Sequence, residues 1–309
     1  MNAVIEVHGL LKKFGTLQAV SDLSFTVQQG QVYGFLGQNG AGKSTTIRML
    51  LTLIQPTSGT IKLFGLDLQQ HRKTILQQVG AIIERPDLYN YLTALQNLRL
   101  LATLSGVRCT HNQLMQQLDL VGIGNRANST VKTFSQGMKQ RLGIACALIH
   151  NPQLIILDEP TNGLDPQGIA DVRNLILRLA HDEGKTVFVS SHLLSEIEVM
   201  ADAMLIIDKG RKVAEGRVTE LLDPAKTLVL VETPDAVKAA PLLQNGTWGF
   251  EKVTANTIQL RLHRNSIAAL NKYLVQNGIA VTSLTPRHSL EAYFLSLTSA
   301  NEHVAPVEN

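Results

Sequence analysis

The chain has 309 residues and a formal net charge of +3, and 44% of its residues are hydrophobic. This length accommodates two domains, and this apolar content is enough for a buried core. Lysine and arginine are interspersed with acidic residues along the whole chain, so we expect no nucleic-acid partner.

No stretch approaches the roughly 20 consecutive apolar residues of a membrane-spanning helix, and the N-terminus lacks the pattern of a signal peptide. We therefore expect a protein that is soluble by itself and acts on a membrane only through a partner. Cys109 and Cys146 have no metal or redox spacing, so we expect them to be small buried hydrophobic residues.

Two short strands, at residues 5–7 and 19–27, are predicted to form an antiparallel edge around a turn at residues 12–15. Phe14 lies in that turn, and its ring could stack on an adenine. The alternative is that Phe14 is an ordinary half-buried aromatic residue, and this residue by itself favours that alternative.

A phosphate-binding loop is predicted directly after an apolar strand at residues 31–36. The loop has the spacing glycine, four residues, glycine, lysine, hydroxyl, and Thr45 follows it. Its members are Gly37, Gln38, Asn39, Gly40, Ala41, Gly42, Lys43 and Ser44. The glycines allow a tight turn that brings backbone N–H groups close to phosphate oxygens. Lys43 places a positive charge near the β- and γ-phosphates, the Ser44 hydroxyl can bind Mg²⁺, and the next helix directs its N-terminal dipole at the phosphates.

Between about residues 88 and 151 the apolar residues recur at helical spacing, which predicts a helical insertion into an α/β core. Near its end, Ser135 and Gly137 precede a helix predicted at residues 139–149. Ser135 and the backbone around Gly137 would lie at the helix N-terminus, where anions bind. A simple helix cap explains this motif equally well.

Two further predicted strands end in polar side chains. The apolar strand at residues 154–157 leads into Asp158, which can hold Mg²⁺, and Glu159, which can orient or deprotonate an attacking water. The four apolar residues ahead of Asp158 favour burial over a solvated strand end. The strand at residues 186–189 is followed by His192, which could hydrogen-bond a γ-phosphate, although a lone histidine is more often an unremarkable polar residue.

After about residue 223 the order strand, helix, strand, strand, helix, strand predicts a small ferredoxin-like domain. The strands are expected at residues 227–231, 248–253, 258–262 and 279–283, the helices at 234–243 and 266–276, and a closing helix at 290–297. The segment lacks a catalytic combination of residues. We therefore expect an accessory or dimerisation domain at residues 223–309, separate from a nucleotide-binding domain at residues 1–222.

Taken together, these motifs resemble the ATP-binding subunit of an ATP-binding-cassette (ABC) transporter over roughly residues 5–222. The order of the motifs carries the resemblance: Phe14, the phosphate loop, a signature motif, Asp158-Glu159, the turn at Asp165, and His192. The family signature is usually Leu-Ser-Gly-Gly-Gln. Here it reads Phe134-Ser135-Gln136-Gly137-Met138, in which the serine and one glycine match.

The resemblance implies an α/β fold, ATP and Mg²⁺ as cofactors, and hydrolysis by Glu159 with Lys43 and His192. It also implies that two cassettes pack head to tail, with ATP between the phosphate loop of one and the signature of the other. The residues that would contact ATP in trans are Ser135, Gln136, Gly137 and Met138, and Asp165 would lie in the turn called the D-loop. A homodimer is the simplest arrangement, and a heterodimer stays open. The other partners would be integral-membrane permease subunits, which would hold the chain at the cytoplasmic face of the cell membrane.

Glu84 occupies the position where most family members have a glutamine that links Mg²⁺ and water to the permease. The resemblance therefore makes Glu84 a coupling-loop residue and, with Ser44 and Asp158, a candidate Mg²⁺ ligand. Residues 80–94, together with 289–294, resemble the branch that exports bacitracin and lantibiotics for immunity and resistance. We thus expect export of an antimicrobial peptide or drug.

Two other function classes fit the sequence less well. A non-transport ABC ATPase acting on ribosomes or DNA would have two cassettes or a long coiled coil, and the insertion shows no sustained heptads. A regulatory ATP-binding module would not need the full catalytic set that ends in His192. Transport is favoured over both.

Overall fold

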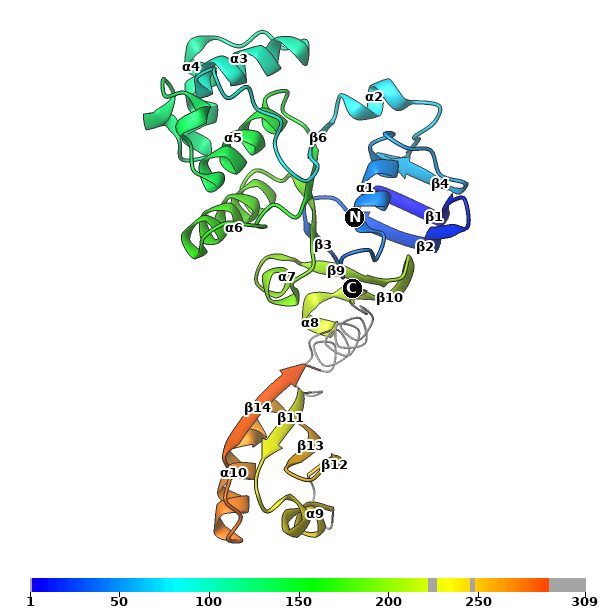
Figure 1. Cartoon of the computed structure of the whole chain (residues 1–309). Coiled ribbons are helices and arrows are strands. Elements are labelled where there is room, and N and C mark those ends of the chain that lie inside the picture. The colour runs from blue at the N-terminus through cyan, green and yellow to red at the C-terminus, as the bar shows by residue number, and fades with distance from the viewer. Residues whose placement is uncertain (1, 222–226, 245–247, 289–309) are drawn as a thin grey trace, which may run out of the picture. The chain divides into compact units, whose positions relative to one another are not determined.

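The computed structural model describes residues 2–221, 227–244 and 248–288 of the chain (Figure 1). The chain divides into two compact units, Met1–Arg217 and Val218–Asn309. Within the described ranges, none of the helices is both long and apolar enough to cross a membrane.

One sheet of the first unit is antiparallel. Its strands are β1 (Ala3–Phe14), β2 (Leu17–Gln28), β4 (Ser58–Leu63) and β5 (Leu66–Asp67), in the order β2-β1-β4-β5. The predicted strands at residues 5–7 and 19–27 are too short, because β1 continues to Phe14, which pairs with Leu17. Several register shifts in this pairing interrupt the period-two alternation by which a strand is recognised in a sequence.

The second sheet of this unit is mostly parallel and carries the site. Its strands are β3 (Val32–Gly37), β6 (Val79–Ile82), β7 (Leu154–Asp158), β8 (Thr186–Ser191), β9 (Ala203–Asp208) and β10 (Arg211–Arg217), in the order β10-β9-β3-β8-β7-β6. Only β10 pairs antiparallel to its neighbour. Every residue of β3, β7 and β8 is buried, as in parallel sheets covered on both faces. Because β3, β8 and β7 are neighbours, their carboxyl ends bring the predicted motifs to one edge.

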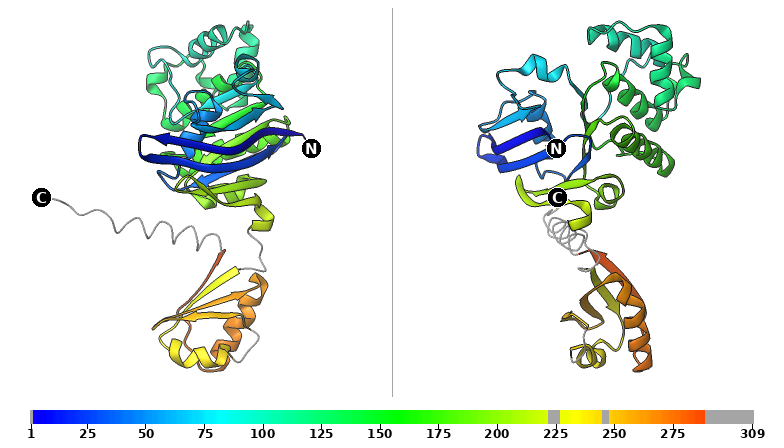
Figure 2. Two further views of the ribbon diagram at one scale, coloured as in Figure 1. Left: turned by 90° about the vertical axis from the view of Figure 1, so that its right-hand side faces the viewer. Right: turned by 180° about the vertical axis from the view of Figure 1, so that it is seen from behind.

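The core of the first unit lies between the two sheets. Phe25 of β2 packs with Tyr33, Phe35 and Phe188 of the mostly parallel sheet, at ring-centroid distances of 6.0 to 6.1 Å. Helix α1 (Lys43–Leu50) adds Ile47, Met49 and Leu50 to the same core. Figure 2 shows β1 and β2 as a separate layer beside the mostly parallel sheet. This packing fixes the phosphate loop, which joins β3 to α1.

Helices α3 (Ala94–Leu104), α4 (His111–Leu120) and α5 (Gln136–Leu148) gather apart from the antiparallel sheet, as Figure 1 shows. They occupy the chain between β6 and β7, which confirms the predicted helical insertion. The helix predicted at residues 139–149 begins earlier, at Gln136, because Ser135 caps it.

The remaining α-helices described in the first unit are α2 (Arg72–Leu76), α6 (Pro166–His181) and α7 (Leu194–Met200). Helix α6 begins at Pro166 because Asp165 caps it and proline suits the first helical position.

The second unit contains α8 (Val218–Leu221) and a separate α+β core. Its later elements are β11 (Thr227–Glu232), α9 (Ala236–Gln244), β12 (Phe250–Val253), β13 (Thr257–Leu262), α10 (Ile267–Gln276) and β14 (Ser283–His288). The strand order is β12-β13-β11-β14, and all neighbours are antiparallel. Alternate residues of β11 and β13 pack with α9 and α10 in one core, so both helices cover the same face.

The last strand of this unit begins later than predicted, at Ser283 and not at residue 279. Ile279 is buried, but its N–H bonds to the carbonyl of Leu274 at the end of α10. Proline cannot donate a backbone hydrogen bond and is therefore rare in central strands. Pro286 is compatible with β14 because β14 lies at the edge of the sheet. The helix predicted at residues 290–297 lies outside the described residues.

Candidate active site

The predicted phosphate loop connects the buried end of β3 to the first turn of α1. Gly42 has a φ of +103°, and a Cβ placed on it would lie 2.6 Å from the carbonyl oxygen of Ala19. A Cβ on Gly37 would lie 2.8 Å from the carbonyl oxygen of Ile207. Gly42 is therefore needed for its backbone conformation and for space, and Gly37 is needed for space.

Lys43 lies under this loop with 5% of its surface exposed. Its Nζ donates to the carbonyl oxygens of Gly37, at 2.7 Å, and Gln38, at 3.2 Å. Gln38, Asn39, Gly40 and Ala41 lie in the loop between Gly37 and Lys43. Ser44 and Thr45 follow in the first turn of α1.

Asp158 and Glu159 follow one another where β7 ends. Asp158 is 1% exposed, and its Oδ1 accepts a hydrogen bond of 2.5 Å from Ser190 Oγ. The backbone N–H of Glu159 donates to the same Ser190 Oγ at 2.9 Å. Asp158 Oδ2 is buried and has no partner among the described residues. Ser190 is a site residue that the sequence reasoning missed, although its position at the end of an apolar strand was a signal.

Three predicted catalytic residues from different elements meet at one carboxylate. Lys43 Nζ lies 3.1 Å from Glu159 Oε1, and His192 Nδ1 lies 2.9 Å from Glu159 Oε2. Since an ionised carboxylate only accepts hydrogen bonds, the Nδ1 of His192 is the donor. Glu159 has a φ of +49°, a backbone conformation that residues other than glycine rarely adopt.

A cavity of about 440 Å³ opens beside this carboxylate. Its lining combines the phosphate loop, the ends of β6 and β7, and the first turns of α5: Ser44, Glu84, Arg85, Gln136, Gln140, Asp158, Glu159, Asn162 and Gly163. Gln140 was not predicted. It is 4% exposed, and its Nε2 has no partner among the described residues. The signal for it was its place one turn after the signature residue Gln136.

Glu84 lines the cavity, but its carboxylate is engaged elsewhere. Its Oε1 lies 2.6 Å from Nη2 of Arg48 on α1, and 44% of the Arg48 side chain and 63% of the Glu84 side chain are exposed. An exposed pair of this kind contributes about 0–1 kcal/mol. The sequence reasoning missed Arg48 because the two residues are far apart in the chain.

The other predicted site residues lie outside the lining of this cavity. Ser135 Oγ accepts from the backbone N–H of Met138 at 3.3 Å, which is a helix cap. Asp165 caps α6 by accepting from the Gly168 N–H at 3.1 Å. A Cβ built on Gly137 would lie 3.9 Å from the Cα of Gly168, so the signature faces the start of α6.

Phe14, the last residue of β1, is 48% exposed. The Nζ of Lys12 lies 4.8 Å from its ring centroid, an arrangement typical of a cation–π contact.

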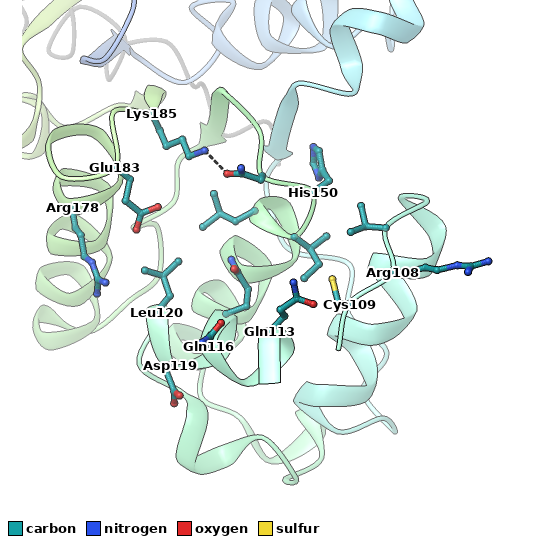
Figure 3. Close-up of a pocket in the computed structure, with 15 residues that line it drawn as sticks. Arg108, Cys109, Gln113, Gln116, Asp119, Leu120, His150, Arg178, Glu183 and Lys185 are labelled. Carbon is teal, nitrogen blue, oxygen red and sulfur yellow. Dashed lines mark hydrogen bonds between the residues drawn. The ribbon is translucent and has the colours of Figure 1, made fainter. Parts of the chain in front are cut away.

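A larger cavity, of about 780 Å³, lies at the opposite edge of the mostly parallel sheet (Figure 3). Asn151 precedes β7 and Lys185 precedes β8, and both line it, with Lys185 Nζ donating to Asn151 Oδ1 at 2.5 Å. Its lining contains none of the predicted site residues. The smaller cavity, where the motifs converge, is therefore the candidate site.

Comparison with known proteins identifies the family. The family model described as ABC transporter matches residues 20–162. The bacitracin transport ATP-binding protein BcrA of Bacillus licheniformis is 43% identical over 300 residues, covering 96% of this chain and 98% of that protein. The lantibiotic transport ATP-binding protein SrtF of Streptococcus pyogenes is 41% identical over 212 residues, covering 69% of this chain and 90% of that protein.

Solved structures show the same fold. The structure of an ATP-binding subunit of an ABC transporter aligns with a TM-score of 0.63 at 33% identity, over 71% of this chain and 91% of that one. A dimeric ATP-binding cassette bound to ADP and Pi aligns with a TM-score of 0.63 at 23% identity, over 69% of this chain and 98% of that one. The 43% identity to the bacitracin relative over nearly the whole of both chains, together with the 41% identity to the lantibiotic relative, shows that the chain belongs to the ABC transporter family as an ATP-hydrolysing, ATP-binding subunit, in the branch of the bacitracin and lantibiotic transport proteins.

Proposed function

We propose that this chain powers a separate membrane permease that exports an antimicrobial peptide or a drug. The observation that carries the proposal is the similarity to the bacitracin transport protein, which spans 96% of the chain and so reaches into the second unit. The daunorubicin/doxorubicin resistance ATP-binding protein DrrA of Streptomyces peucetius, 35% identical over 85% of this chain and 78% of that protein, supports the drug alternative. The chain would then act at the cytoplasmic face of the cell membrane, held there by the permease.

The cavity has the chemistry to hold MgATP. Mg²⁺ in such sites takes one or two carboxylates together with phosphate oxygens and water. The unpartnered Oδ2 of Asp158 and the Ser44 hydroxyl fit this requirement. The Oε1 of Glu84 would be free for the ion only after its contact with Arg48 breaks. When bound, the ion would neutralise charge on the phosphate oxygens.

The carboxylate of Glu159 is the proposed base or water-orienting group for hydrolysis. His192 fixes its direction through the Nδ1 hydrogen bond at 2.9 Å. Lys43 supplies a positive charge between the loop carbonyls and Glu159, where it can pair with an anionic oxygen held in the loop.

Assembly completes the proposal. Two cassettes would pack head to tail so that Ser135, Gly137 and Asp165 of one face the phosphate loop of the other. A homodimer remains the simplest arrangement, and a heterodimer stays open. For the second unit we propose a ferredoxin-like accessory or dimerisation domain, supported by its element order and its strand order β12-β13-β11-β14.

The test is resistance in a sensitive host that expresses the chain together with its partner permease. The host is challenged with bacitracin, a lantibiotic and daunorubicin, and Glu159→Gln serves as the inactive control. We expect increased resistance to at least one compound with the natural chain and none with the control. Unchanged sensitivity to all three, alongside ATP hydrolysis by the purified chain, would reject export of these compounds and leave the ATPase assignment standing.

A further inference from the structure

One carboxylate ties the segment that carries His192 to the segment that follows Glu159. Glu196, in the first turn of α7, accepts two hydroxyl hydrogen bonds at the same atom, Oε2. Ser191 Oγ donates one at 2.7 Å, and Thr161 Oγ1 donates the other at 2.9 Å. Ser191 and Thr161 are 2% and 4% exposed, so losing the acceptor would leave two buried hydroxyl groups without this partner.

These two bonds are part of a ring of contacts that includes the Glu159 carboxylate. Ser191 directly precedes His192, and Thr161 lies two residues after Glu159. The ring then closes through the hydrogen bond between His192 Nδ1 and Glu159 Oε2, at 2.9 Å. Removing Glu196 would break the link between Ser191 and Thr161, and the bond from the Glu159 N–H to Ser190 Oγ would be left to hold the two segments together. The phosphate loop takes no part in the ring.

We infer that Glu196 is a positioning residue for ATP hydrolysis, which holds His192 against Glu159 by fixing Ser191 and Thr161 to one carboxylate oxygen. The inference rests on the roles proposed above for Glu159 and His192. A shift of about 1 Å in a catalytic group can lower a rate by a factor of up to about 100. ATP binding should change little, because its phosphate contacts lie in the loop at Lys43.

The first experiment measures ATP hydrolysis by the purified full-length chain. Glu196→Ala should lower kcat roughly ten- to a hundredfold and leave the KM for ATP nearly unchanged. Glu196→Gln should retain most of the turnover, because the amide oxygen can still accept both hydroxyl bonds. Glu183→Ala is the matched control, since it removes an exposed carboxylate at the opposite edge of the sheet. An unchanged kcat in Glu196→Ala would overturn the inference.

The second experiment separates positioning from a general loss of stability. If Glu196 acts through His192, adding Glu196→Ala to His192→Ala should lower kcat little further, since interacting sites are not additive. If the double variant instead loses kcat by the product of the two single losses and its KM for ATP rises, Glu196 has only a structural role and the inference is overturned.

The single variants separate this inference from the proposed catalytic roles. If His192→Ala keeps full turnover, the proposed role of His192 fails and the inference fails with it. If His192→Ala and Glu159→Gln lose turnover and Glu196→Ala does not, the catalytic roles stand and only the inference fails.

Discussion

Two acidic residues in loops beside the candidate cavity have a left-handed backbone conformation. Glu159 has a φ of +49° and Glu84 a φ of +60°. Residues other than glycine in this region cost about 1–3 kcal/mol each, and such conformations persist only where the surroundings hold them. Glu159 is held by Lys43 and His192, whereas Glu84 is held by an exposed arginine. At the scale of single residues, the first carboxylate is fixed and the second is the easier one to move.

This difference predicts separate effects for two matched substitutions. Glu84→Gln should keep substantial ATP hydrolysis, because the proposed base is untouched, but it should change export by altering the coupling loop. Glu159→Gln should nearly abolish turnover. Both are measured as ATP hydrolysis and substrate export in the complex reconstituted with the permease. Arg48→Ala serves as a control for loss of the ion pair alone. The reverse pattern, with hydrolysis lost only in Glu84→Gln, would show that the two roles are exchanged.

The two cysteines are half-buried, not fully buried as expected from the sequence, and they should differ in reactivity. Burial raises the pKa of the Cys146 thiol to about 12. At pH 8 its thiolate, the reactive form, should then be on the order of one part in 10,000. We expect a disulfide reagent to label Cys109 and spare Cys146 in the native chain, and Cys109→Ser to remove the fast labelling. As the pH rises toward 12, the thiolate fraction and the labelling of Cys146 should increase. Rapid labelling of Cys146 at pH 8 in Cys109→Ser would contradict the raised pKa of its thiol.

At the scale of elements, parallel strands assemble the site and helix caps set where the neighbouring helices begin. The capping residues Thr93, Thr110, Ser135 and Asp165 each accept a hydrogen bond from a backbone N–H three residues later. Two of these caps are predicted site residues, so their substitution would mix functional and structural effects. A cap remote from the site separates them.

Thr110 provides that test on α4. Its hydroxyl accepts from the N–H of Gln113, and the Gln113 side chain bonds back to the N–H of Thr110. Thr110→Ala should lower the free energy of unfolding by about 0.5–2 kcal/mol in urea denaturation. Thr110→Ser should restore most of the loss, and ATP affinity should be the same in all three proteins. A Thr110→Ala protein as stable as the natural chain would show that this cap contributes nothing.

At the scale of the whole molecule, the two units have separate cores. One cluster of buried apolar residues includes β1, β2, β3 and α1, and another includes β11, β13, α9 and α10. Each core is built from residues of its own unit. All the predicted phosphate-handling residues lie in the first unit.

A chain truncated to residues 1–217 should therefore fold and bind MgATP with nearly the affinity of the full chain. Calorimetric titration measures the affinity, and circular dichroism checks that the truncated protein is folded. Reduced solubility or weaker self-association is expected if the second unit is a dimerisation domain. A folded truncated chain that no longer binds ATP would show that the second unit is part of the nucleotide site.

Residues of the candidate site could be predicted where the chemistry requires several groups to be adjacent in the sequence. The phosphate loop depends on consecutive backbone N–H groups, so its glycines and Lys43 must be adjacent. Asp158 and Glu159 had to follow a buried strand, and His192 had to follow another. Such local requirements also made the α/β fold predictable from the sequence.

Only the tertiary structure decided which distant side chains meet these residues. Arg48 reaches Glu84, Ser190 joins Asp158 to Glu159, and Glu196 joins the two segments beside the site. The structure also decided element ends, such as the later start of β14. By itself the sequence determined which groups are available for phosphate chemistry, because each motif is a continuous segment with its own backbone geometry. The partners of those groups depend on strand order and helix placement, which follow from packing across the whole core and leave no local pattern in the sequence.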